Sequence, residues 1–246
     1  MRLFHYTSIE TLALILKNKT IRFTRLDKVD DPDEYGIKED GVTPAHYCFV
    51  SCWTKNIDES IPQWYIYGNS SHGVRLELNE NMFDIESDSR GYEYLANVKR
   101  TSLGDGVLPI LNHKVLYDIQ YVENVENIDK KIFKSMGEQK GLYLPEVGVY
   151  KSKDWEFQNE CRFKLYAMPM KPFFANRVYS LPDVVANNIP PKVSYIDVPL
   201  AFNALNKMNI LLGPKSTDAE KVIVGALMEK YLGRTDYQIS SYTDKM

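Results

Sequence analysis

Apolar and polar residues alternate along several short segments of the chain, and this period of two is typical of β-strands. The segments predicted as strands by their pattern are 20–24, 47–53, 74–78, 115–121, 153–166, 195–198 and 210–212. A period near 3.6, typical of amphipathic helices, follows residues 9–16 and 217–227 instead. The chain is therefore predicted to mix short strands with a few helices.

Helix starts are predicted from capping residues. Thr7 with Glu10, and Thr217 with Glu220, have the spacing of a capping box. We expect the second of these helices to bury an apolar stripe that consists of Ala219, Val222, Ile223, Ala226 and Leu227. A further helix, rich in lysine, is expected over residues 127–139, and residues 61–67 are expected to form a helical turn.

The most informative segment is 153–163, read as one alternating strand. Its apolar face carries Trp155, Phe157, Cys161 and Phe163, and its polar face carries Glu156, Gln158, Glu160 and Arg162. Successive side chains on one face are about 6–7 Å apart. We hypothesise that Glu160 is the reactive carboxylate of the protein. The alternative is a solvent-facing edge strand whose charges maintain solubility.

Composition and charge limit the class of protein. The chain has 246 residues, of which 44% are hydrophobic and 26% charged, as in ordinary globular proteins. A net charge of −3 argues against binding through a broadly basic surface. We predict one domain over residues 1–246, with a poorly readable insertion around 79–145.

Cysteine usage and the lack of a leader sequence or long apolar run predict a reduced, cytoplasmic protein with no membrane association. Cys48 and Cys52 stand beside His46, but no second pair of ligands follows them. Buried thiols are therefore favoured over zinc, and no metal is expected.

Polar and aromatic residues at the ends of predicted elements form four groups: His5 with Tyr6 and Thr7, Ser51, Trp64 with Tyr67, and Gln158 with Glu160. Cleavage of the glycosidic bond of NAD could use all of them. An aromatic ring can stack on nicotinamide, and a His or Thr can bind ribose or amide groups. A carboxylate can stabilise the positive charge that develops on the ribose.

These residues belong to a longer pattern. It consists of His5-Tyr6-Thr7-Ser8, Leu14-Ile15-Leu16, Asp31-Pro32-x-Glu34, Phe49-Val50-Ser51-Cys52-Trp53, Trp64-x-x-Tyr67, Gly73-Val74, Glu160-x-Arg162 and Ile210-Leu211-Leu212-Gly213-Pro214. Over nearly the whole chain the pattern resembles a bacterial family known as domain of unknown function 2971. More distantly, its layout resembles the ADP-ribosyltransferase superfamily.

That second resemblance implies an α+β fold of two small packed, mainly antiparallel sheets with flanking helices. It also implies a toxin or defence effector that uses NAD as substrate. His5, Tyr6, Thr7, Ser51, Trp64 and Tyr67 would bind NAD or support its cleft, and the catalytic group would be Glu160 with Gln158 and Arg162. The acceptor, protein or nucleic acid, and any antitoxin or defence-system partner are not identified by the sequence.

The sequence departs from the superfamily pattern at two places. Residues 49–53 do not read Ser-Thr-Ser, and Gln158 replaces a Glu that several relatives of the family carry. The second departure bears on the choice of acceptor.

Two other functions stay open. A metal-dependent nuclease could use Asp27, Asp30, Asp31 or Glu34 together with Glu160, because paired carboxylates bind Mg²⁺. A non-catalytic module could bind a nucleotide or a peptide in the same cleft, because a fold does not determine function.

Overall fold

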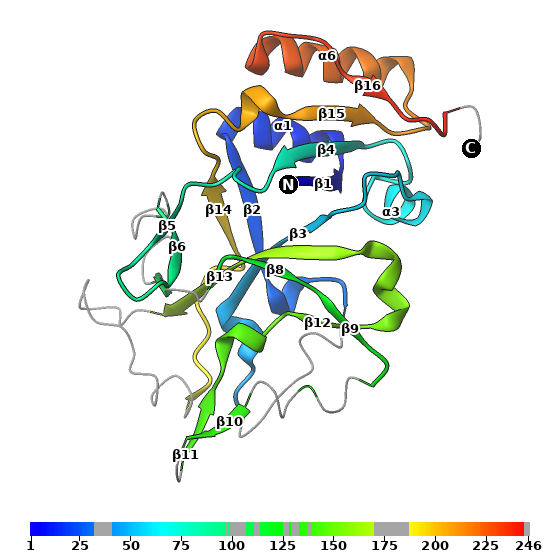
Figure 1. Cartoon of the computed structure of the whole chain (residues 1–246). Coiled ribbons are helices and arrows are strands. Elements are labelled where there is room, and N and C mark those ends of the chain that lie inside the picture. Colours follow the sequence, from blue (N-terminus) through cyan, green and yellow to red (C-terminus); the bar gives the residue numbers. More distant parts are fainter. Residues whose placement is uncertain are drawn as a thin grey trace. The chain divides into compact units, whose positions relative to one another are not determined.

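The computed structural model describes residues 1–31, 41–96, 98, 107–110, 114–124, 128, 133–136, 139–169 and 187–243 of the chain. In the described residues, the strands form a ten-stranded sheet and three two-stranded sheets, and a few helices accompany them (Figure 1). This mixture confirms the predicted α+β class. In the described part of the chain, no helix has both the length and the apolar character needed to cross a bilayer.

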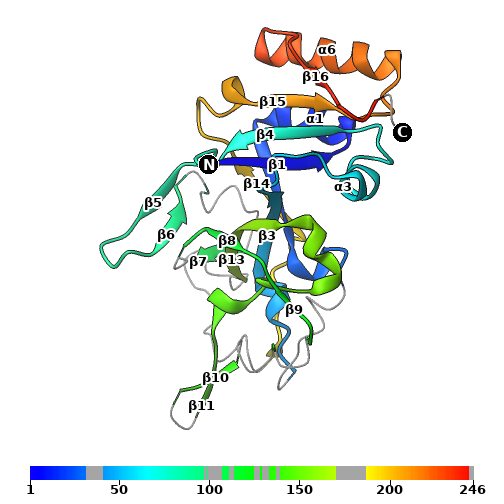
Figure 2. The same ribbon diagram turned by 45° about the vertical axis from the view of Figure 1, so that its right-hand side comes forward.

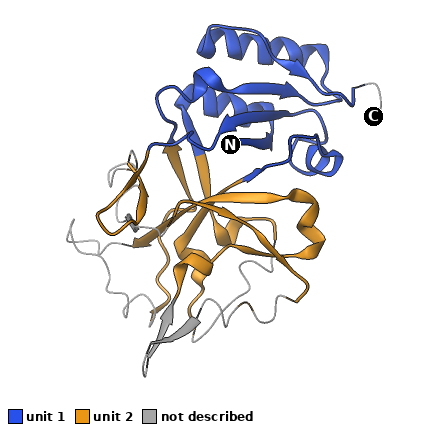
Figure 3. Cartoon of the chain, in the orientation of Figure 1, with its two compact units in different colours: residues 1–21, 53–84, 199–246 blue, residues 22–52, 85–198 orange. Residues whose placement is uncertain are grey.

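The chain forms two compact units (Figure 3). Unit 1 comprises residues 1–21, 53–84 and 199–246, and unit 2 comprises residues 22–52 and 85–198. The strands that contain residues of both units are β2 (Thr20–Arg25), β3 (Cys48–Thr54) and β14 (Tyr195–Pro199). The assignment of the whole chain to a single domain stays a prediction.

The sheet of unit 1 is built on β1 (Arg2–Thr7) and β4 (Val74–Asn79), which pair antiparallel along their whole length. On the other side of β4 lies β15 (Asn209–Leu212), also antiparallel, and β16 (Gln238–Ile239) adds to it in parallel. A Cβ on Gly73 would lie 2.2 Å from the carbonyl oxygen of Thr7. Glycine is therefore required where the chain enters β4.

Helix α1 (Ile9–Asn18) starts one residue later than the sequence predicts. The N-cap is Ser8, whose hydroxyl accepts a hydrogen bond from the Thr11 N–H at 3.2 Å. Thr7 is the last residue of β1, so the predicted capping box of Thr7 with Glu10 is wrong. The helix buries Leu12, Ile15 and Leu16 and packs against α6.

Helix α6 (Asp218–Leu232) begins at the predicted capping box. Thr217 Oγ1 accepts from the Glu220 N–H at 3.3 Å, and Glu220 Oε2 accepts from the Thr217 N–H at 2.7 Å. The predicted core face is wrong, however. Val224 and Met228 are buried. Of the five residues predicted to be buried, Leu227 is half-buried and the other four are exposed: Ala219, Val222, Ile223 and Ala226. In Figures 1 and 2, α6 lies along the side of unit 1 that carries β15 and β16.

Unit 2 is organised around β13 (Glu160–Pro169), which is buried along its whole length. It pairs with β3, and also with β7 (Val107–Ile110) and β8 (Leu116–Asp118). Strand β3 also pairs antiparallel with β2. The core of this unit consists of Leu26, Ala45, Cys48, Val50, Tyr117, Ile128, Val147, Val149, Tyr150 and Tyr166.

The described part of unit 2 also contains three short pairs of strands. They are the antiparallel pair β5 (Ile85–Ser87) with β6 (Glu93–Leu95), the antiparallel pair β10 (Phe133–Met136) with β11 (Gln139–Leu142), and the parallel pair β9 (Gln120–Val122) with β12 (Tyr150–Ser152). The first of these pairs, with β7, lies in the segment that the sequence left unreadable.

Most predicted elements are found, and three are corrected. The strand predicted over 115–121 is interrupted at Ile119, whose N–H donates to the carbonyl of Glu160 at 3.0 Å. Residues 133–136 form β10 where a helix is predicted, because pairing with β11 overrides local preference. Residues 153–158 form a 3₁₀-helix, so the informative strand begins only at Glu160.

The capping box of α6 gives a stability prediction. Thr217→Ala should lower the free energy of unfolding by about 1 kcal/mol, because an alanine leaves the Glu220 N–H without its side-chain acceptor. Urea unfolding followed by circular dichroism measures this change. Thr235→Ala, at an exposed position beyond the helix, is the matched control. Equal losses in both variants would contradict the capping role.

Candidate functional site

Glu160 occupies the first position of β13 because of the turn that precedes it. The 3₁₀-helix Lys153–Gln158 ends at Asn159, whose φ of 42° lies in the left-handed region. Asparagine tolerates this conformation better than most residues. The chain therefore reverses sharply and brings the end of the 3₁₀-helix next to the start of the strand.

The carboxylate of Glu160 lies between two cations. Lys151 on β12 donates to Glu160 Oε2 at 2.8 Å and to Gln158 Oε1 at 2.8 Å. Arg162 Nε donates to Glu160 Oε1. All four side chains are buried. The structure thus brings together Gln158, Glu160 and Arg162, the three residues that the sequence predicts as catalytic.

These cations determine the protonation state of Glu160. Burial alone would raise its pKa, but the charges of Arg162 and Lys151 outweigh burial and lower the pKa to about 2. The thiol of Cys52 also hydrogen-bonds to the carboxylate. Burial, and then the charge of Glu160, raise the pKa of Cys52, so the group beside the carboxylate is a neutral thiol.

Arg162 connects the carboxylate to the backbone. Its Nη1 donates to the carbonyl of Gly148 at 3.2 Å, and its side chain is 1% exposed. Arg162 therefore contacts both the Glu160 carboxylate and a backbone carbonyl. The alternative of a solvent-facing edge strand is wrong, because β13 is buried and pairs with β3 as well as with β7 and β8.

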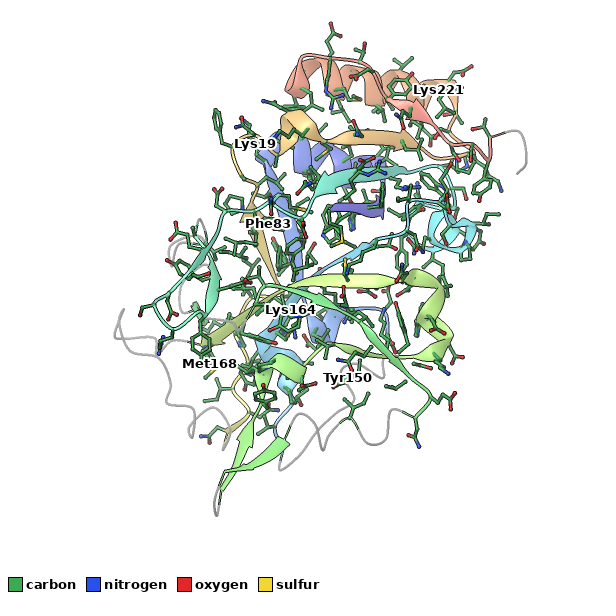
Figure 4. All side chains as sticks on the ribbon, in the orientation of Figure 1. Lys19, Phe83, Tyr150, Lys164, Met168 and Lys221 are labelled. Carbon is green, nitrogen blue, oxygen red and sulfur yellow. The ribbon has the colours of Figure 1, made fainter. Side chains whose placement is uncertain are left out.

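Lys164 follows Arg162 on the same face of β13 and is also buried (Figure 4). Its ammonium donates to the carbonyls of Pro145 at 2.9 Å and Val147 at 2.8 Å. It lies 3.7 Å from the ring centroid of Tyr117. Burial lowers the pKa of Lys164 to about 7, so its charge is lost near neutral pH.

Three residues that contact Glu160 were not predicted as site residues: Lys151, Cys52 and Tyr121. The Tyr121 hydroxyl accepts from the backbone N–H of Glu160 at 2.8 Å. The sequence did carry a signal for Lys151, since basic residues surround the segment 153–163, but such residues are usually solvated. The thiol could not be assigned, because the partner strand of β13 was unknown.

Ser51 is buried in β3. Its neighbour Cys52 reaches Glu160, and successive side chains of a strand point to opposite faces. The structure therefore places Cys52 at the carboxylate, on the face of β3 opposite to Ser51. A role for Ser51 in NAD binding stays a prediction.

The remaining predicted residues belong to unit 1. The ring of His5 lies 5.1 Å from that of Trp53, and Tyr6 meets Trp64 edge to face at 4.9 Å. The Tyr6 hydroxyl accepts from the Ser60 N–H at 2.9 Å. Thr7, at the end of β1, is buried. His5 and Tyr6 are thus held in place by packing on aromatic side chains.

Helix α3 (Ile61–Ile66) carries Trp64 and ends at Tyr67. Trp64 is fully buried and donates its ring N–H to Glu59 at 2.9 Å, which anchors the helix. Tyr67 is half-buried and accordingly the more accessible of the two aromatic residues. Contacts of either residue with NAD stay a prediction.

The nuclease alternative would use the acidic residues of the segment 27–34 together with Glu160. Both carboxylate oxygens of Asp27 accept from Arg25, at 2.5 and 3.0 Å. Asp31 is buried, and Glu34 lies outside the described residues. Among the residues that the structure describes, no group of three or more His, Cys, Asp or Glu side chains is placed to hold a metal ion.

The two cysteines of β3 also have separate surroundings. Cys48 belongs to the core of unit 2, with its sulfur 4.0 Å from the carbonyl of Val147, whereas Cys52 contacts Glu160. His46 lies 3.8 Å from Asp27. Cys48 is buried as the sequence predicts, whereas Cys52 is half-buried.

Comparison of the chain with protein-family models, with curated proteins and with solved structures finds no match.

The low pKa of Lys164 gives a pH-dependent prediction. The unfolded state, where the pKa is about 10.5, binds more protons than the folded state, where it is about 7, so this residue makes stability rise with pH between these values. Lys164→Met should be most stabilising, relative to wild type, at pH about 6, and should lose a few kcal/mol of that advantage by pH about 10.

Chemical denaturation across this pH range measures the difference. Lys192→Met, at an exposed lysine, is the control and should show a flat difference. A difference for Lys164→Met that does not change with pH would contradict the assignment.

Proposed function

We propose that the chain is an NAD-dependent ADP-ribosyltransferase of the toxin or defence-effector type, with Glu160 as its catalytic carboxylate and a macromolecule as acceptor. The observation that carries the proposal is the buried, ionised Glu160, held together with Gln158 by one lysine ammonium. A carboxylate of this kind keeps its negative charge at any physiological pH.

That charge suits the bond that would be cleaved. As the bond between ribose C1′ and nicotinamide breaks, nicotinamide leaves with the electron pair and positive charge develops on the ribose. A fixed carboxylate stabilises this charge more strongly in a buried site than in water. The acceptor group then attacks C1′ and loses a proton.

The neighbours of Glu160 would position its carboxylate and bind the pyrophosphate of NAD. Arg162 holds Oε1, which fixes the side-chain conformation of Glu160. Oε2 is held by the Lys151 ammonium, which would move to a phosphate oxygen when a ribose hydroxyl binds Oε2. Lys151 and Arg162 carry two positive charges against one negative charge on Glu160, and this excess favours a pyrophosphate.

The resemblance to ADP-ribosyltransferases adds three elements to the proposal. The α+β fold would have the packed two-sheet arrangement of that superfamily. His5, Thr7 and Tyr67 would contact NAD. Gln158, in the Gln-x-Glu arrangement, would contribute to the choice of acceptor.

Nicotinamide release from labelled NAD in the presence of cell extract tests the proposal. Glu160→Asp keeps a negative charge near Lys151 and Arg162 but withdraws the carboxylate from both, so we expect a lower melting temperature, a protein still folded at the assay temperature, and activity at least about 100-fold lower. Glu156→Gln removes an exposed carboxylate from the preceding 3₁₀-helix and should retain activity. Wild-type protein that releases no nicotinamide, or a fully active Glu160→Asp, would refute the proposal.

A further inference from the structure

A surface cavity lies in unit 1, between the turn that follows β4 and the segment that joins β14 to β15. Its volume is about 410 Å³, within the range of about 300–1,000 Å³ that is usual for small-molecule sites. The residues that line it belong to the segments 78–84 and 201–207. The N–H of Ala201 donates to the carbonyl of Met82 at 2.8 Å, so the two walls of the cavity are joined directly through the backbone.

Both walls of the cavity are turns that local hydrogen bonds hold in shape. On one wall, Asn79 Oδ1 accepts from the Asn81 N–H at 3.1 Å. On the other wall, the N–H of Ala204 donates to the carbonyl of Ala201 at 2.9 Å, and the N–H of Lys207 donates to the carbonyl of Ala204 at 3.2 Å. Turns fixed in this way give the cavity its form before a ligand binds, which lowers the cost of binding.

Phe202 stands at the rim of this cavity. It lines the cavity and is 94% exposed, whereas Leu78 and Met82, which also line it, are buried. The ring of Phe202 therefore packs on very little of the protein and offers a flat apolar face to a ligand. A ligand that covers this face removes apolar surface from water, which favours binding.

Polar side chains form the rest of the lining, and they are Asn79, Asn81, Asp84, Asn203 and Lys207. Carboxamides both donate and accept hydrogen bonds, an ammonium donates and a carboxylate accepts. The formal charges of Asp84 and Lys207 cancel, so the lining does not select an ion of either sign. These groups suit an uncharged ligand that carries several hydroxyls, because each hydroxyl also donates and accepts.

We propose that this cavity binds a neutral sugar, with Phe202 stacked on the C–H face of a pyranose ring and the exposed carboxamides of Asn81 and Asn203 bound to its hydroxyls. The balance of groups favours a sugar over a nucleobase. A base has two apolar faces and polar groups only at its edge, whereas a pyranose carries hydroxyls around its whole circumference. Among the described residues that line the cavity, one is aromatic and five are polar.

Saturation-transfer NMR of the full chain tests the site with a panel of neutral sugars. The panel consists of glucose, galactose, mannose, N-acetylglucosamine, maltose, cellobiose and lactose. We expect at least one of them to bind with a dissociation constant of about 1 mM or lower, as a good contact for a ligand of this size allows. The residues of this cavity differ from those proposed to bind NAD, so the two proposals are tested separately.

Variants locate the binding. Phe202→Ala should weaken sugar binding at least about 10-fold, because it removes the stacked ring, and should leave the unfolding midpoint unchanged, because that ring is exposed. Asn203→Ala should also weaken binding, through the loss of a hydrogen bond. Tyr65→Ala is the matched control, since Tyr65 is 65% exposed and does not line the cavity, and it should bind the sugar like wild type.

The absence of binding by every sugar of the panel, or sugar binding that Phe202→Ala leaves unchanged, would overturn the proposal. Adenosine, measured in the same way, is the probe for a nucleobase site. Adenosine binding that Phe202→Ala weakens, while no sugar binds, would assign the cavity to a base instead.

Discussion

The arrangement of unit 2 depends on one buried interaction, the contact of the Glu160 carboxylate with Lys151 and Arg162. It joins β12, the 3₁₀-helix and β13, and the Cys52 thiol adds β3. Removal of one partner from such a cluster leaves a buried charge without compensation, at a cost of about 3–5 kcal/mol. A cluster of this cost needs a reason beyond stability, since apolar residues would pack as well. The proposed catalytic use of Glu160 supplies one.

The buried ionisable groups on this face of β13 differ in how their charges are compensated. Glu160 and Arg162 compensate each other and stay ionised, whereas the ammonium of Lys164 is bound by neutral carbonyl oxygens and lies against an aromatic ring. Its pKa accordingly falls to about 7. One strand thus carries a carboxylate fixed in its charged form and an amine close to neutrality.

The sequence predicted much of the local structure, because pattern and capping chemistry act over short distances. Strands β2, β3, β4, β14 and β15 and the start of α6 lie where alternation and Thr217 place them. The predictions failed where strand pairing or tertiary packing, rather than the local sequence, determines the structure. Residues 133–136 pair as β10, and the periodicity of α6 could not distinguish its two apolar faces.

The residues of the candidate site also fall into two groups, those that the local sequence identifies and those that only the fold brings to the site. Glu160, Gln158 and Arg162 were found from one segment, although the strand expected there begins only at Glu160. Lys151 and Cys52 come from other strands, and only the fold brings them to the carboxylate. Whether His5 and Tyr67 share a cleft with Glu160 stays a prediction.

The most direct test of the central claim is a titration of Glu160. Carbon-13 NMR of the side-chain carboxyl groups, with Glu160→Asp to assign the signal, should show a pKa near 2, because Arg162 and Lys151 hold the charged form. A pKa at or above the ordinary value of 4.5 would mean that these cations do not hold the carboxylate, and the account of the site would be wrong.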